Sequence, residues 1–125
     1  MAFQQISHPI NGATATTSAV VNIEGAKRVV FVFIRTDHSS GKTVFSVKVS
    51  PDNTTYITYN KLIDNVANTN SQTLTRVASY DTGAANGAKF YTMSPEDVFP
   101  YVEVTATETT DGTHDVWVIA EYDEN

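Results

Sequence analysis

The side chains best suited to acid–base chemistry or metal binding are scattered along this sequence. Its three histidines, His8, His38 and His114, lie far apart, and it contains no cysteine. The lack of cysteine excludes a thiolate nucleophile, a thiolate zinc ligand and a disulfide framework. No Gly-x-Ser-x-Gly motif is present to hold a nucleophilic serine. We therefore interpret the histidines as polar surface residues and predict that the protein is not an enzyme.

Carboxylates form two small groups, and neither has the spacing of a known site. Glu96 and Asp97 are adjacent, while Glu121, Asp123 and Glu124 lie near the end of the chain. Neither group matches an EF-hand loop or the carboxylate pair of a glycosidase. We expect the pair in the first turn of a short helix, where acids interact favourably with the helix dipole. We expect the second group to be either a solvated chain end or a contact at the rim of an interface.

Other aspartates lie beside turn-forming residues, where an aspartate typically binds its own backbone. We expect this role for Asp52, Asp111 and Asp115. The sequence therefore predicts no metal site and no cofactor.

The charge and hydropathy of the chain exclude two classes of partner. Its formal net charge is −6, and its eight cations are dispersed, with Lys27 and Arg28 as the one adjacent pair. Nucleic-acid binding requires clustered cations, so we expect none. No apolar stretch approaches membrane length, and residues 1–10 lack the features of a signal peptide. We predict neither a nucleic-acid nor a membrane partner.

Residues 27–36 contain the most informative element, six consecutive apolar residues from Val29 to Ile34 that are all β-branched or aromatic. Such a run is typical of a strand, and we expect both of its faces to be covered. Leu62 and Leu74 are the only leucines, whereas threonine and valine are abundant. This composition predicts an all-β protein.

Strand and turn signals alternate along the chain. They predict a single-domain antiparallel β-sandwich, jelly-roll or Ig-like, with about eight strands and at most one short helical turn. The strands are expected at residues 13–17, 20–23, 27–36, 43–50, 56–59, 72–80, 101–107 and 114–122, with residues 61–70 as strand followed by loop. Asn11-Gly12 and Asn86-Gly87 are expected turns, and Asp111-Gly112 predicts the last hairpin.

The aromatic residues offer the plainest interaction surface. Five tyrosines lie in or beside expected strands: Tyr56, Tyr59, Tyr80, Tyr91 and Tyr101. Exposed tyrosines suit sugar or protein binding, but cross-strand packing on a half-buried sheet is the favoured interpretation. Trp117 and Ile119 are expected on one face of the last strand, and Val116 and Val118 on the opposite face. Trp117 is expected to close an end of the core.

Residues 1–12 are predicted to form an N-terminal arm, and residues 13–125 a single β-sandwich domain. Phe3, Ile6, Pro9 and Ile10 are apolar residues separated by Gln, Ser and His. We expect this arm to lack strand pairing of its own and to fold over the sandwich or lie on a neighbouring subunit. These four residues are the candidate partner contacts. Deleting residues 1–10 is accordingly expected to leave thermal stability nearly intact.

The order of several segments resembles small β-sandwich virion proteins of tailed bacteriophages, in particular capsid decoration (cement) proteins. A Gly-Ala-Lys-Arg lead at residues 25–28 enters an apolar strand, and residues 45–53 read as a strand with a Ser-Pro-Asp-Asn turn. Pro-Tyr-Val-Glu-Val at residues 100–104 follows a short turn at residues 94–99, and a hairpin strand closes the chain. The similarity covers residues 16–122 through short motifs, and it carries over no functional residue.

The resemblance implies a non-enzymatic protein that is made in the host cytoplasm and binds the outside of a capsid shell. Its partners would be the major capsid protein and copies of itself, as a trimer or dimer, and it would stabilise the shell through non-covalent contacts. An alternative is a carbohydrate- or receptor-binding module of a phage tail or cell-surface protein. That alternative predicts exposed tyrosine rings on one face of a sheet.

Overall fold

A computed structural model describes residues 2–64 and 75–123 of the chain. Those residues form eleven strands and one short 3-10 helix. The elements are β1 (Ala2–Ala13), β2 (Thr17–Asn22), β3 (Arg28–Thr36), β4 (Thr43–Ser50), β5 (Ile57–Thr58), β6 (Leu62–Asp64), β7 (Arg76–Val77), β8 (Ser79–Asp81), β9 (Gly87–Met93), η1 (Pro95–Asp97), β10 (Tyr101–Glu108) and β11 (Thr113–Asp123).

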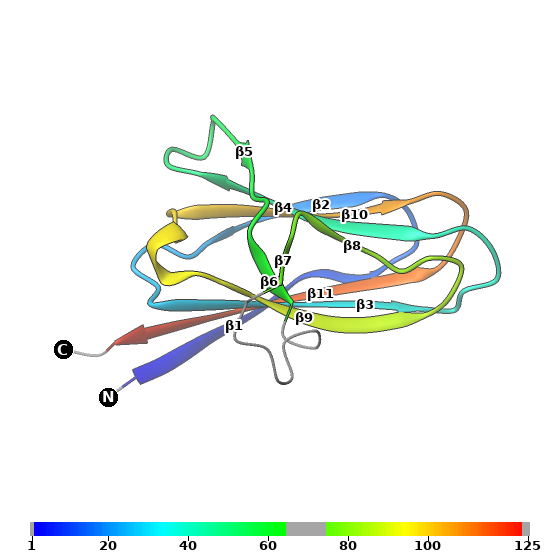
Figure 1. Cartoon of the computed structure of the whole chain (residues 1–125), viewed down its shortest axis with the longest axis horizontal. Helices are drawn as coiled ribbons and strands as arrows, with labels where there is room; N and C mark the ends of the chain where they lie inside the picture. The colour runs from blue at the N-terminus through cyan, green and yellow to red at the C-terminus, as the bar shows by residue number, and fades with distance from the viewer. Residues whose placement is uncertain (1, 65–74, 124–125) are drawn as a thin grey trace.

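The strands form two antiparallel sheets packed face to face, which confirms the predicted β-sandwich (Figure 1). One sheet has the order β1-β11-β3-β9-β6-β7, and the other has the order β2-β10-β4-β5, with β8 also paired to β4. The strand number exceeds the expected eight partly because residues 2–13 are themselves a strand. The strand expected at residues 72–80 is divided into β7 and β8, and residues 65–74, part of two expected segments, lie outside the described residues.

Alternate side chains of β3 point into the core, so the expectation that both faces of this strand are covered is wrong. Val29, Phe31 and Phe33 are fully buried between the sheets, whereas Val30 and Val32 are only half-buried on the other face. The apolar run therefore reflects two different environments. One face forms the core, and the other forms part of the external surface of the six-stranded sheet.

Aromatic rings connect the two sheets at the centre of the core. Phe33 of β3 stacks on Phe45 of β4 with ring centroids 5.1 Å apart, and Tyr91 of β9 lies 5.6 Å from Phe33. All three side chains are buried. Aromatic contacts of this kind add to the stabilisation from burial of their apolar area. They join the two sheets at the centre of the core.

Arg35, at the end of β3, joins three loops at one end of the sandwich. Its side chain is fully buried, and Nη1 donates to the carbonyl oxygens of Gly41, Gly83 and Ala85 at 3.1–3.3 Å. Nη2 donates to the carbonyls of Ser40 and Asp111, and the Asp111 carboxylate lies 3.8 Å away. The guanidinium thus satisfies backbone acceptors that strand pairing leaves free.

The predicted roles of the turn aspartates agree with the structure in part. Asp52 accepts hydrogen bonds from the backbone N–H groups of Thr54 and Thr55, as expected, and these bonds lower its pKa. Asp111, by contrast, accepts from the N–H groups of Ser39 and Ser40 in another loop. Asp115 lies within β11 rather than in a turn.

Three further turn predictions have mixed outcomes. The hairpin at Asp111-Gly112 is confirmed, because β10 and β11 flank it. Asn11-Gly12 belongs to β1, so neither a turn there nor a strand at residues 13–17 forms as expected. The turn at Pro95–Asp97 is present, but Ser94 makes no capping hydrogen bond and accepts one from Arg76 at 3.0 Å instead.

Among the described residues, no helix has the length and apolar character needed to cross a membrane.

Candidate interaction surface

The residues predicted to form a free arm are instead the edge strand of the six-stranded sheet. β1 pairs antiparallel with β11 along most of its length, with Phe3 opposite Tyr122 and Ile6 opposite Ile119. The prediction of an arm without strand pairing is therefore wrong. This pairing is hard to predict from the sequence because glutamine, serine and proline interrupt the apolar residues, and the partner strand lies more than a hundred residues away.

The four candidate contact residues have different environments. Phe3 and Ile6 are 52% and 60% exposed, Pro9 is half-buried, and Ile10 is buried in the core at 1%. Only Phe3 and Ile6 are thus largely available to a partner. Burial of Ile10 also alters the expected effect of deleting residues 1–10, since loss of a buried isoleucine alone costs about 2–5 kcal/mol. Point substitutions are the appropriate tests of this strand.

An apolar surface covers the outer face of the six-stranded sheet. The strand registers place one set of side chains from β1, β11, β3 and β9 on this face, away from the core. We call the apolar members of this set the outer face: Ile6, Val30, Val32, Ile34, Ala88, Phe90, Trp117 and Ile119. Ile6, Phe90 and Ala88 are exposed, the first two by more than 40%, and the other five residues of the outer face are half-buried. The same side of the sheet also carries polar residues beside them: Gln4, Arg28, Thr92, Asp115 and Glu121.

Two rows of paired residues give the outer face its continuity. Ile6, Ile119 and Val30 are successive cross-strand partners, and Trp117, Val32 and Phe90 form the next row. Cross-strand partners contact one another through their side chains. The apolar residues are therefore contiguous across four strands of the sheet.

Trp117 lies on the outer face and does not plug the core. The predicted alternation is confirmed, because Val116 and Val118 are buried and Trp117 and Ile119 point outward. The His8 ring stacks on the indole at a centroid distance of 3.6 Å, and His8 Nε2 lies 2.9 Å from the Asp115 carboxylate. Asp115 also accepts from the N–H of Gly12 at 3.0 Å. These contacts fix β1 against β11.

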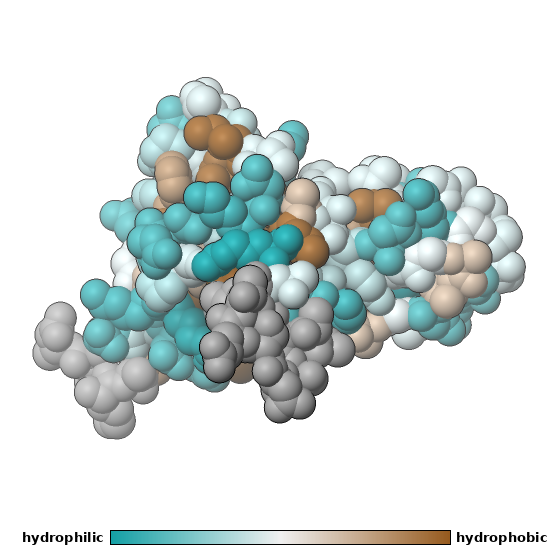
Figure 2. Space-filling model, in the orientation of Figure 1, coloured by the Kyte–Doolittle hydropathy of each residue, from teal (hydrophilic) through white to brown (hydrophobic). Residues whose placement is uncertain are grey.

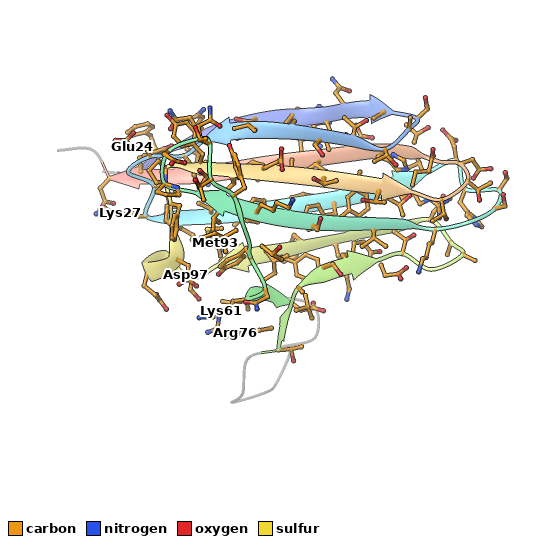
Figure 3. The ribbon with its side chains drawn as sticks, turned by 90° about the horizontal axis from the view of Figure 1, so that it is seen from above. Glu24, Lys27, Lys61, Arg76, Met93 and Asp97 are labelled. Carbon is orange, nitrogen blue, oxygen red and sulfur yellow. The ribbon has the colours of Figure 1, made fainter. Side chains whose placement is uncertain are left out.

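A second feature lies where β1 and β11 project past the end of the other sheet, close to both termini (Figure 1). Phe3, Gln5 and Tyr122 line an open groove of about 470 Å³ together with Asn22 and Glu24. The Phe3 and Tyr122 rings stack at 5.4 Å. Figure 3 shows Glu24 and Lys27 at this same end of the molecule. Because the groove is open, it suits contact with a partner's surface better than a reaction that requires an enclosed site.

The strand tyrosines do not form an exposed platform. Tyr59 and Tyr91 are buried, and Tyr56, Tyr80 and Tyr101 are half-buried. Tyr80 packs 6.0 Å from Tyr91 and 5.9 Å from Phe45. The favoured interpretation, cross-strand packing, is confirmed for Tyr80 and Tyr91. Burial raises the pKa of Tyr59 to about 12, and its hydroxyl donates to Asp97 at 2.9 Å.

The side of the sandwich formed by β6, β7 and β8 is largely polar (Figure 2). Figure 2 shows hydrophobic areas there as separate spots, one of them around β5, where Ile57 is 54% exposed. A pocket of about 180 Å³ beside β5 is lined by Ile57, Phe99 and Asp97 among others. Separate apolar spots of this kind are common on protein surfaces.

His114 is fully buried, so the interpretation of all three histidines as surface residues is wrong for this one. Its Nε2 lies 2.9 Å from the Thr43 hydroxyl and 3.6 Å from the Glu108 carboxylate. Burial lowers the pKa of His114, the Glu108 charge opposes this change, and the Arg35 charge adds to it. The arrangement resembles a buried structural histidine that is hydrogen-bonded through Nε2. No group of three or more possible metal ligands occurs among residues 2–64 and 75–123.

The lowered pKa of His114 predicts a pH-dependent stability. The unfolded chain takes up a proton at this histidine near pH 6.5, whereas the folded protein does so only at a lower pH. Protons therefore favour unfolding, and the free energy of unfolding should decrease as pH falls below about 6.5. The decrease should stop where folded His114 itself becomes protonated. Urea denaturation between pH 8 and about 4.5 measures this dependence.

A His114→Gln variant is the matched control, because glutamine retains hydrogen-bonding capacity toward Thr43. Its stability should vary less with pH over the same range. Asp111 acts at lower pH, since hydrogen bonds from Ser39 and Ser40 hold its pKa at about 2, and its contribution is lost as pH falls from about 3.8. An unchanged pH dependence in the variant would show that His114 is not responsible.

Comparison with solved structures finds a similar fold in a protein encoded by a prophage. The structure titled "Crystal structure of SPBc2 prophage-derived protein YomS" aligns over 97% of this chain and 95% of its own, with a TM-score of 0.70 and 10% sequence identity. The likeness at this identity establishes a shared sandwich fold. No protein-family model and no curated protein matches the sequence.

Proposed function

We propose that the protein is a structural component of a bacteriophage virion that binds the outside of the capsid shell and stabilises it. The observation that carries the proposal is the outer face, whose apolar side chains are contiguous across four strands and partly exposed. The shared fold with a prophage-derived protein over nearly the whole chain supports a phage origin. The partner is the major capsid protein, and the contacts are non-covalent. Neither catalysis, a membrane nor nucleic acid has a part in this role.

The size of the outer face determines how such docking works. The outer face spans twelve strand positions, one in β1, three in β11, five in β3 and three in β9. At about 3.4 Å by 4.8 Å per position, its projected area is roughly 200 Å². A standard protein interface buries about 800 Å² per partner, so one outer face alone supports only weak binding. Many copies on a repeating shell compensate through avidity, because several modest contacts act together.

Phe90 offers the sharpest test, because it is the exposed aromatic residue of the outer face. Its side chain is 44% exposed, and Val20 on the outside of the other sheet is also 44% exposed. We expect Phe90→Glu to lower the affinity for capsid shells at least tenfold, since it places a charge in an apolar contact that costs about 1.4 kcal/mol or more. Val20→Glu should bind like the wild type.

The measurement is co-sedimentation of the purified protein with shells assembled without it, together with a thermal-denaturation check on each variant. Failure of the wild-type protein to bind such shells would overturn the proposed function. Equal losses in the two variants would show that the outer face is not the docking surface.

The alternative, a carbohydrate-binding module, is less favoured by the described surface. The tyrosines expected to form its platform are buried or half-buried. The groove beside Phe3 and Tyr122 presents aromatic rings, but these stack on one another.

A further inference from the structure

The first half of β1 is an edge strand that no described strand covers. β1 is the terminal strand of its sheet, and no described strand pairs with the side that faces away from β11. Residues 2–7 contain no charged side chain. Proteins normally protect a long edge with charges, proline, bulges or a covering segment, because an open backbone edge is a template for another strand.

The second half of the same strand carries such protection. Pro9 lacks a backbone N–H, and the register with β11 shifts between Ser7 and Ile10 and again between Asn11 and Ala13. Two other edges, β5 and β7, are only two residues long. The open edge is thus confined to the segment that begins at Ala2 and ends at Ser7.

The exposed side chains of this segment also indicate a missing neighbour. Phe3 is 52% exposed on the inner side of the strand, and Ile6 is 60% exposed on the outer side. The six-residue edge strand β2 is also uncharged, but its one largely exposed apolar side chain, Val20, lies on a single face. An added strand beside β1 would cover apolar side chains on both faces at once.

We propose that residues 2–7 pair with the same segment of a second copy of this chain. Antiparallel pairing of identical strands about a twofold axis is self-complementary, and it joins the two six-stranded sheets into one. The segment is neutral, so pairing it with itself opposes no like charges within the strands, although the whole chain carries −6. The projection of β1 and β11 beyond the other sheet leaves this edge accessible (Figure 1).

The alternation of side chains restricts the register. A twofold axis perpendicular to the sheet keeps the inner sides of both copies on one side, so an inner residue must oppose an inner residue. Phe3 and Gln5 are inner residues, and Gln4 and Ile6 are outer ones. The longest pairings that obey this rule place either Gln4 opposite Gln4 or Gln5 opposite Gln5 at the axis.

This pairing also extends the docking surface, a consequence that rests on the proposed function. The two outer faces become parts of one surface, which doubles the projected area to roughly 400 Å². A dimer therefore presents twice the docking surface of a monomer.

The absence of cysteine permits a direct test with single-cysteine variants of the full chain. Opposed residues of antiparallel strands are close enough for a disulfide. We expect either Gln4→Cys or Gln5→Cys to form a linked dimer at least tenfold faster than Val20→Cys, the control on the edge of the other sheet. Sedimentation velocity of the wild-type protein should show a concentration-dependent dimer, and Gln5→Lys should weaken it about tenfold or more.

A wild-type protein that stays monomeric at millimolar concentration, with all three cysteine variants linking at the same rate, would overturn the inference. The outcome is separate from that of the shell-binding experiment. A monomer that binds shells contradicts only the dimer, and a dimer that fails to bind shells contradicts only the proposed function.

Discussion

Replacing Arg35 with methionine is expected to lower the free energy of unfolding by about 3–5 kcal/mol. The guanidinium is fully buried and donates to carbonyls in three separate loops, at Ser40 and Gly41, at Gly83 and Ala85, and at Asp111. Methionine fills a similar volume but leaves these acceptors without a donor. Since small domains are stable by about 5–15 kcal/mol, the effect is a large part of the total.

Arg28 provides the matched control, because it lies at the other end of β3 and is exposed. Arg28→Met should change stability by less than about 0.5 kcal/mol. Urea denaturation of both variants gives the comparison. If Arg35→Met does not fold, Arg35→Lys, which keeps the charge but loses the two-nitrogen geometry, should still be clearly destabilised. Equal effects at positions 28 and 35 would contradict the role assigned to the buried guanidinium.

Phe33→Ala is expected to cost about 3–5 kcal/mol, the range typical of a buried phenylalanine. The ring is fully buried, stacks on Phe45 of the opposite sheet at 5.1 Å and lies 5.6 Å from Tyr91. Its loss leaves a cavity between the sheets, because neighbours in a close-packed core relax only in part.

Phe90→Ala is the matched control for Phe33→Ala, because Phe90 lies on the outer face. Phe90 is 44% exposed, so truncation there should cost much less than at Phe33. Thermal or urea denaturation of the two variants measures the difference. Similar losses at both positions would contradict the assignment of Phe33 to the core and Phe90 to the surface.

Local patterns in the sequence predict most of the sandwich. The alternation in residues 43–50 and 114–122 identifies β4 and β11, and the Asp-Gly pair identifies the hairpin between β10 and β11. These signals depend on residues close together in the chain. The alternation also identifies which side of β11 faces the core, and burial in the structure confirms it.

Long-range pairing accounts for what the sequence does not reveal. β1 is a strand because β11 lies beside it, although its own residues include Pro9 and an Asn-Gly pair typical of turns. In the sequence, Arg35 resembles an exposed cation at the end of a strand. Its acceptors are backbone carbonyls, which the identity of the residues does not reveal. The outer face likewise combines residues of four strands, so no single segment predicts it.

The proposed function requires the outer face to dock on a capsid shell. Cryo-electron microscopy of the virion would locate the protein and show which of its surfaces contacts the shell. We expect density for this sandwich on the capsid exterior, with Phe90, Trp117 and Ile119 turned toward the major capsid protein. Density in another part of the particle, or on the shell with the outer face directed to solvent, would contradict it.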